Sequence, residues 1–193
     1  FQMGKADDPL QLLVGGYTGR QIGLYTAGFA LLFVVGIAAW SLAFGRLRAT
    51  QIMAIALVGL FALAGSLFLL NHSHPSELLR IRGLIGLVSV SLLVASGFTP
   101  AALVYLAGLA EEFPRSRGGM MGLYSVFLGV GQFIGSGLGG FFADWRGVDG
   151  MVVLTVLLGI LSAGCVAALA RQDSRLGPTA RDAGAVRMPH GLH

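Results

Sequence analysis

Residues 110–147 read AEEFPRSRGGMMGLYSVFLGVGQFIGSGLGGFFADWRG, a charged loop followed by an uncharged run over residues 118–143. A helix crosses a lipid bilayer with about 20 apolar residues, so this run is long enough to span one. Gly131, Gly135 and Gly139 repeat every four residues and share one helical face. Small residues at this spacing let two helices pack backbone to backbone in lipid. The stretch therefore predicts a membrane helix that packs closely against a neighbour.

The composition of the whole chain also indicates a membrane protein. Charged residues make up 11% of the sequence, against about 25% in soluble domains. The net charge of +4 comes from residues scattered in short loops and a tail, which is typical of the flanks of membrane spans. Because the positive residues form no basic face, we expect no nucleic-acid partner. The one cysteine, Cys165, excludes a disulfide framework.

The uncharged runs predict an all-α integral membrane protein with five spans. Residues 1–21 are expected to form an extramembrane connection, and residues 171–193 a disordered tail, because the tail has few large apolar side chains. Gly97 and Pro100 favour a kink in the third span, since proline removes one helical hydrogen bond. The expected spans are residues 22–44, 51–70, 83–110, 118–143 and 151–170.

An odd number of spans places the two ends of the chain on opposite sides of the membrane. Lys and Arg are more frequent on the side that holds the tail, largely because of the tail itself. This excess predicts a cytoplasmic tail.

Polar side chains are concentrated in the third and fourth expected spans. A polar stripe at membrane depth faces protein or a water-filled cavity, so we expect these two spans to be interior and the second and fifth to be peripheral. The alternative is that each Ser or Thr hydroxyl bonds to a carbonyl of its own helix or to a neighbouring helix. The candidate path residues are Ser89, Ser96, Thr99, Tyr105, Tyr124, Ser125, Gln132 and Ser136.

Three segments resemble the second half of a major facilitator superfamily transporter. This family has twelve helices in two six-helix halves. EEFPRSRGG (111–119) and the glycine-rich span closing in GGFFADWRG (139–147) resemble the loop and helix after the family's tenth span. GRLR (45–48) resembles the cytoplasmic loop after its eighth span, although it has no Asp. The resemblance implies helices eight to twelve of a twelve-helix bundle, with the eighth, tenth and eleventh lining the central cavity and the ninth and twelfth outside it.

The same resemblance implies a secondary active carrier of a small solute that works by alternating access in the cell membrane. Its partners would be the lipid bilayer, the solute and a missing N-terminal half of the same polypeptide. The two cytoplasmic loops would act as gates, whereas the alternative for them is a solvated loop that only sets topology. The expected gate residues are Gly45, Arg46, Arg48, Glu111, Glu112, Arg115 and Arg117.

The expected spans contain no Asp, Glu, Lys, Arg or His. If transport is coupled to a proton, its titratable group is therefore expected in the missing half, or else at a span end such as Glu111, Glu112 or Asp144. His72 and His74 have no third ligand nearby, so we expect no metal and no cofactor.

A non-catalytic structural or accessory membrane subunit is the alternative function. An enzyme needs paired titratable residues or metal ligands at membrane depth, and the expected spans offer neither. A structural subunit would not need polar stripes or glycine-rich interior helices. The sequence therefore favours a transporter and does not favour an enzyme.

Overall fold

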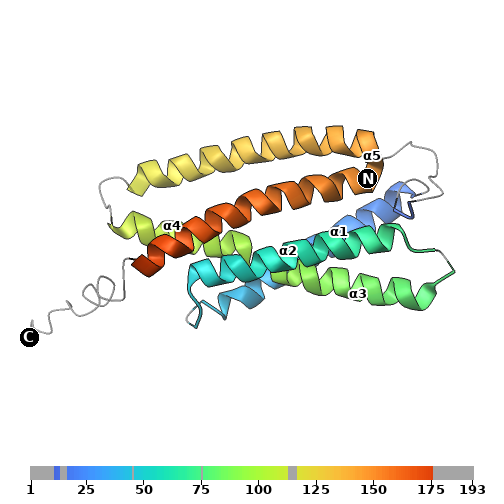
Figure 1. The fold of residues 1–193 in the computed structure, drawn as a ribbon, viewed down its shortest axis with the longest axis horizontal. Helices are drawn as coiled ribbons and strands as arrows, with labels where there is room; N and C mark the ends of the chain where they lie inside the picture. The colour runs from blue at the N-terminus through green and yellow to red at the C-terminus, as the bar shows by residue number, and fades with distance from the viewer. Residues whose placement is uncertain (1–10, 14–16, 45, 75, 113–116, 176–193) are drawn as a thin grey trace, which may run out of the picture.

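The computed structural model describes residues 11–13, 17–44, 46–74, 76–112 and 117–175, and every regular element in them is an α-helix. Figure 1 shows these helices running along one common axis. This confirms the predicted all-α class. The helices are α1 (Gly19–Ser41), α2 (Ala49–Asn71), α3 (Leu78–Ala95), α4 (Phe98–Glu112) and α5 (Arg117–Arg175).

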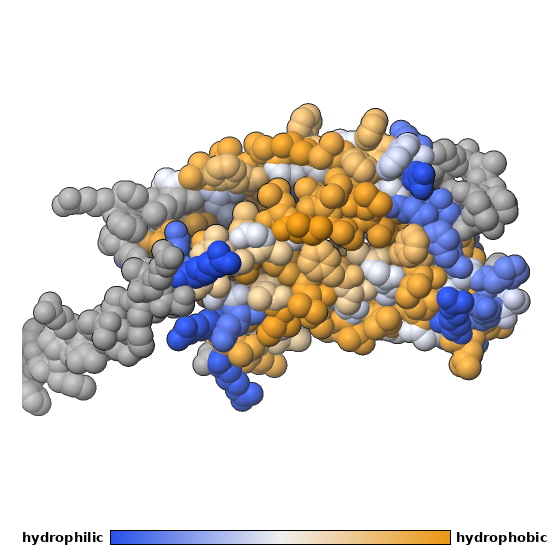
Figure 2. All heavy atoms as spheres, viewed as in Figure 1, coloured by the Kyte–Doolittle hydropathy of each residue, from blue (hydrophilic) through white to orange (hydrophobic). Residues whose placement is uncertain are grey.

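Four helical stretches are long and apolar enough to cross a membrane: Gly19–Ser41, Ala49–Asn71, Leu78–Leu109 and Met121–Gln172. The third contains α3 and α4, where one span over residues 83–110 was expected, and the fourth contains the two expected spans of α5. Apolar side chains cover the middle of the bundle in Figure 2, and polar ones gather towards its two ends. A continuous exposed apolar belt of this kind is stable in lipid and not in water.

The first helix begins three residues before the expected start of its span. Thr18 caps it: the Thr18 amide donates to Oε1 of Gln21 over 2.9 Å, and the Gln21 amide donates to Oγ1 of Thr18 over 3.4 Å. This capping box satisfies two amides that the first helical turn would leave without a partner. The local capping sequence, rather than hydropathy, therefore sets the start of α1.

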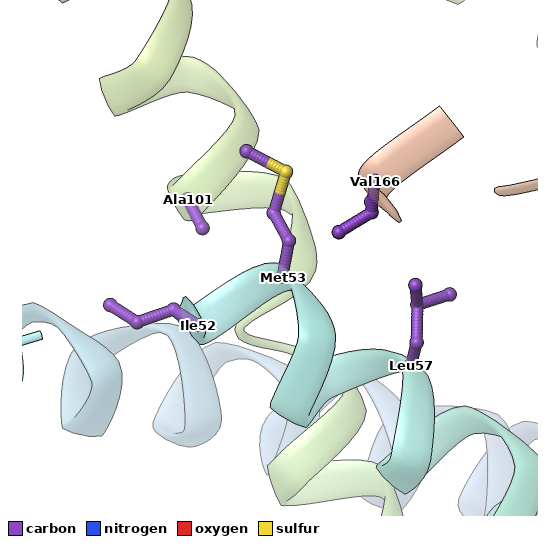
Figure 3. Close-up of a cluster of buried hydrophobic side chains, with 5 residues drawn as sticks. All are labelled: Ile52, Met53, Leu57, Ala101 and Val166. Carbon is purple, nitrogen blue, oxygen red and sulfur yellow. The ribbon is translucent and has the colours of Figure 1, made fainter. Parts of the chain in front are cut away.

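Helix α2 is the centre of the described bundle, since α3, α4 and α5 all pack on it. Its Ile52, Met53 and Leu57 are buried with Ala101 of α4 and Val166 of α5, as Figure 3 shows. This arrangement differs from the peripheral position that was expected for residues 51–70. A helix with few polar side chains can still lie at the centre of a bundle, because helices associate in lipid through close van der Waals packing.

Helix α5 is a helical hairpin whose two arms we call the glycine arm (residues 117–145) and the second arm (residues 148–175). Within α5, only Arg146 and Gly147 have non-helical backbone angles, and they lie among residues 144–150, which separate the two expected spans. Gly147 has φ 62° and ψ −136°, a conformation that side chains strongly disfavour. Gly150 lies against the carbonyl of Phe142, where a Cβ atom would collide. Two glycines therefore allow the chain to reverse within two residues.

The reversal defines the two ends of the bundle. The turn end holds the α5 reversal, the start of α1 and the end of α2, and the tail end holds the end of α5 at Arg175 (Figure 1). Arg46 and Arg48 lie between α1 and α2 at the tail end, where both side chains are exposed.

Candidate functional site

The candidate path residues occupy the faces of α3, α4 and the glycine arm. Four of the serine hydroxyls donate to carbonyls of their own helix, which is the alternative that the sequence left open. Ser89 bonds to Ile85, Ser96 to Leu93, Ser125 to Met121 and Ser136 to Phe133, over 2.9, 2.7, 3.1 and 3.0 Å. Thr99 is exposed at the start of α4. These hydroxyls remain able to accept hydrogen bonds from a solute while they donate to the backbone.

The glycine arm is exposed along nearly its whole length. Gly131, Gly135 and Gly139 have open space where a Cβ atom would lie, so no part of the described chain packs on their face. Gln132 is exposed beside Phe133, whose side chain is 81% exposed. A helix whose small residues would allow close packing thus has those residues and one primary amide on its outer surface, away from the described bundle.

A second cluster joins α1 to the break between α3 and α4. The amide of Gly97 bonds to the Val94 carbonyl, so the helical partner of the Leu93 carbonyl is lost. That carbonyl instead accepts from the indole Nε1 of Trp40, over 3.0 Å, and from the Ser96 hydroxyl. The break therefore lies at Ser96–Gly97 and is stabilised by a side chain from another helix. We call this group the hinge cluster.

Two glycines bring the backbones of the hinge cluster together. A Cβ atom on Gly97 would lie 2.6 Å from Cε2 and 2.7 Å from Nε1 of Trp40. A Cβ atom on Gly36 of α1 would collide with the Ser96 hydroxyl. Pro100, three residues beyond Gly97, lies within the first turn of α4, where the missing amide of proline needs no helical partner. The close contact between α1 and the α3–α4 break therefore depends on Gly36 and Gly97.

Tyr105 and Tyr124, two of the candidate path residues, line one pocket of about 380 Å³ at the tail end. Met53 of α2 and Leu161 and Cys165 of the second arm also line it. None of the described side chains that line the pocket is charged, and the polar ones among them are the two tyrosines, Ser162 and Cys165. Its volume lies within the range of small-molecule sites, about 300–1,000 Å³. We call it the tail-end pocket.

A buried polar network at the turn end was not anticipated from the sequence, and we call it the polar clasp. Asn71 is 0% exposed, and its Nδ2 donates to Oδ1 of Asp149 over 2.9 Å and to Oε1 of Gln11 over 3.1 Å. Its Oδ1 accepts from the Leu13 amide over 3.1 Å. The side-chain amide of Asn71 thus uses both of its donor hydrogens and one of the two lone pairs on its oxygen.

The clasp extends over the α5 reversal. Gln11 accepts from the Val148 amide and donates to the Arg146 carbonyl, both over 3.2 Å. Nε2 of His72 lies 3.3 Å from Oδ2 of Asp149, which forms an ion pair when the imidazole is protonated. These contacts join the amino-terminal segment and the end of α2 to Arg146, Val148 and Asp149 at the α5 reversal. His72 therefore has a defined partner.

Tyr17 adds a further bond at the same end. Its hydroxyl donates to the Leu12 carbonyl over 3.1 Å, and the Leu12 amide donates to the Asn71 carbonyl over 2.8 Å. Burial, followed by the nearby Tyr25, raises the pKa of the Tyr17 phenol above its ordinary value of 10.0. The phenol therefore stays protonated at neutral pH and keeps its donor.

The expected gate loops are described in part. Arg46, Arg48 and Glu111 are exposed at the tail end. Gly45 and Arg115 lie outside the described residues, and so do the side chains of Glu112 and Arg117. Most of the expected connection over residues 1–21 and most of the tail over residues 171–193 also lie outside them.

Comparison with known proteins gave one match. A family model described as Major Facilitator Superfamily matches residues 11–189, which includes all the described helices. No curated protein and no solved structure matched the chain.

Proposed function

Because this chain belongs to the major facilitator superfamily, whose members are membrane transporters, we propose that it forms one wall of a secondary carrier for a small uncharged solute. The observation that supports this most is the outward face of the glycine arm. Gln132 is exposed on it, and Gly131, Gly135 and Gly139 meet nothing from the described chain. A primary amide at membrane depth is poorly accommodated by lipid, so a water-filled path suits this face better.

The solute that suits this wall is uncharged. The side chains that we assign to the path on the glycine arm are hydroxyls and one amide, which donate and accept hydrogen bonds and carry no charge. Gln132 and Ser125 lie seven residues apart on the glycine arm, so both project from one side of that helix. Sugars, polyols and other neutral polar molecules match this chemistry.

The opposite wall would come from the remainder of a longer polypeptide. We map the described helices to the eighth to twelfth of the family on the order of the loops and of the glycine-rich span. On that mapping the glycine arm is the eleventh helix, and its small residues would be covered by helices outside this chain. In lipid, an open small-residue face favours association with another helix.

Alternating access requires a part that bends, and the hinge cluster supplies one. The Leu93 carbonyl already bonds outside its own helix, so α3 and α4 can change their mutual angle without losing an interior helical bond there. The tail end would face the cytoplasm of the cell membrane, with Arg46 and Arg48 among its positive residues. A coupling proton, if one is used, would be carried outside the described helices.

Transport by the native full-length protein in proteoliposomes tests this function. We expect time-dependent uptake of at least one neutral solute from a panel of sugars, polyols and neutral amino acids. Gln132→Leu should slow that uptake about threefold to tenfold, because it removes one hydrogen bond to the solute without a charge change. The matched control is Thr155→Ala on the second arm, where the hydroxyl bonds to the Met151 carbonyl of its own helix over 2.8 Å.

The control should transport at the wild-type rate. Two results would count against the proposal. The first is that no neutral solute enters the proteoliposomes faster than it enters protein-free vesicles. The second is that Gln132→Leu and Thr155→Ala transport the solute at the same rate. The first result would favour a structural membrane subunit.

A further inference from the structure

We propose that the tail-end pocket binds one acyl chain of an anionic phospholipid from the tail-side leaflet, with the lipid phosphate held near Arg48. Tyr105 and Tyr124 line this pocket, so we assign them to the lipid site and leave the proposed solute path on the exposed face of the glycine arm, with Ser125 and Gln132. The position of the pocket, its lining and the positive side chains at the tail end point to a lipid, whatever solute the protein transports.

The lining of the pocket matches a hydrocarbon chain. Met53, Leu106, Val166 and Leu169 supply alkyl surface, and the phenol rings of Tyr105 and Tyr124 supply flat apolar surface. Within the described part of the chain, no side chain that lines the pocket is charged. Among the described lining residues, only the two tyrosines, Ser162 and Cys165 have polar side-chain atoms, so most of the surface offers a polar solute no partner, whereas an alkyl chain needs none.

The pocket also lies where a lipid chain can enter. Its residues belong to the candidate spans Ala49–Asn71, Leu78–Leu109 and Met121–Gln172, so the pocket is inside the membrane-crossing part of the chain. It is open to the outside, since Leu161 is 67% exposed and Cys165 is also exposed while both line it. In a bilayer the molecules that meet such an opening are lipids.

Positive charge at the same end selects the headgroup. Arg48 is exposed and lies immediately before the first residue of α2, five residues before Met53 in the sequence. Arg171 follows the pocket residue Leu169 by two positions on the second arm. Positive side chains at the ends of two helical stretches are thus close in sequence to the pocket lining. An anionic lipid gains about 1 kcal/mol for each such residue near the membrane surface.

The unique cysteine of this chain allows a direct test, because Cys165 lines the pocket. The native full-length protein in detergent is treated with N-ethylmaleimide while phosphatidylglycerol is titrated, and modification is followed by the mass of the peptide that contains Cys165. A bound chain shields the thiol, so the rate should fall about tenfold when the lipid reaches about ten times its Kd. Phosphatidylcholine should protect about fivefold less well, as expected for one lost charge contact.

Paired variants separate the pocket from general effects. Leu161→Trp narrows the pocket and should abolish protection, whereas Leu157→Trp, one turn away on the same exposed arm and outside the pocket, should retain it. Arg48→Gln should reduce the advantage of phosphatidylglycerol, and Arg80→Gln at the turn end should not. Ser162→Phe fills the pocket from a second position, so a misfolded Leu161→Trp protein would not decide the outcome.

Three results would overturn the proposal. Cys165 could react at one rate with and without phosphatidylglycerol, or both pocket-filling variants could keep the wild-type protection. Equal protection by phosphatidylcholine would refute the assignment of an anionic headgroup.

Discussion

Asn71→Leu is expected to lower the free energy of unfolding by about 3 kcal/mol, because it leaves several buried groups of the polar clasp without partners. The substitution keeps the size of the side chain and removes its donors and its acceptor. Asp149, Gln11 and the Leu13 amide each lose a hydrogen bond in a site where Asn71 is fully buried. The shift is measured as the midpoint of denaturant unfolding of the native full-length protein in mixed micelles.

Ser66→Ala is the matched control on the same helix. Ser66 is also buried, at 2% exposed, but its hydroxyl bonds to the Leu63 carbonyl of its own helix, so the change should stay within about 1 kcal/mol. An exchange adds specificity: Asn71→Asp alone places two carboxylates in contact, and Asn71→Asp with Asp149→Asn restores one amide opposite one carboxylate. An exchange that is no more stable than Asn71→Asp would contradict the assigned contact.

Gly97→Ala is expected to destabilise the protein by about 2–4 kcal/mol. The added methyl group would lie 2.6 Å from the Trp40 ring, so the indole must move and its bond to the Leu93 carbonyl is lost. Gly86→Ala on α3 is the matched control, because a Cβ atom there meets nothing within 4 Å. That variant should be neutral or slightly more stable, since alanine favours a helix more than glycine does.

A double-mutant cycle identifies the cause of the Gly97 effect. In a Trp40→Leu background the ring that collides with the methyl group is gone, so Gly97→Ala should cost at least about 1 kcal/mol less than in the wild type. Equal costs in the two backgrounds would mean that the strain arises elsewhere, and the hinge cluster would lose its assigned role.

The position of the hinge could be predicted from the sequence, but its packing partners could not. The backbone properties of Gly97 and Pro100 predict an interruption of the third span, and the helix is interrupted at Ser96–Gly97. The partners in that break, Gly36 and Trp40, lie some sixty residues earlier in an otherwise apolar run. Nothing local to that run shows which turn of α1 will meet α3, because many apolar faces can pack equally well in lipid.

The clasp shows where the sequence reading fell short. Gln11, Asn71 and Asp149 each lie in a short polar connection, and such connections are typical of solvated loops. The alternation of spans does place residues 71–72 and 144–150 at one end of the bundle. That signal predicts that these connections are neighbours. It does not predict that an asparagine among them is buried, since burial depends on how tightly the α5 reversal closes against α2.

The central position of α2 has a similar explanation. Its face with Ile52, Ala56 and Gly59 allows close approach, and a Cβ atom on Gly59 would lie 2.7 Å from the Ala95 amide nitrogen. The peripheral position of residues 51–70 was predicted from their low polar content, which indicates what a helix faces in the complete transporter. Polar content therefore gave no information about packing within this chain.

The face of the glycine arm provides the most direct test of the account. In the native full-length protein with Cys165→Ser, a cysteine is placed at Gln132 on the glycine arm or at Leu157 on the second arm, and its reaction with a membrane-impermeant cationic methanethiosulfonate is followed by peptide mass. If the glycine arm lines a solute path, Gln132→Cys should react at least about tenfold faster than Leu157→Cys, because the reagent attacks the thiolate, which needs water. Equal and slow reaction at both positions would place the glycine arm in lipid and contradict the proposed path.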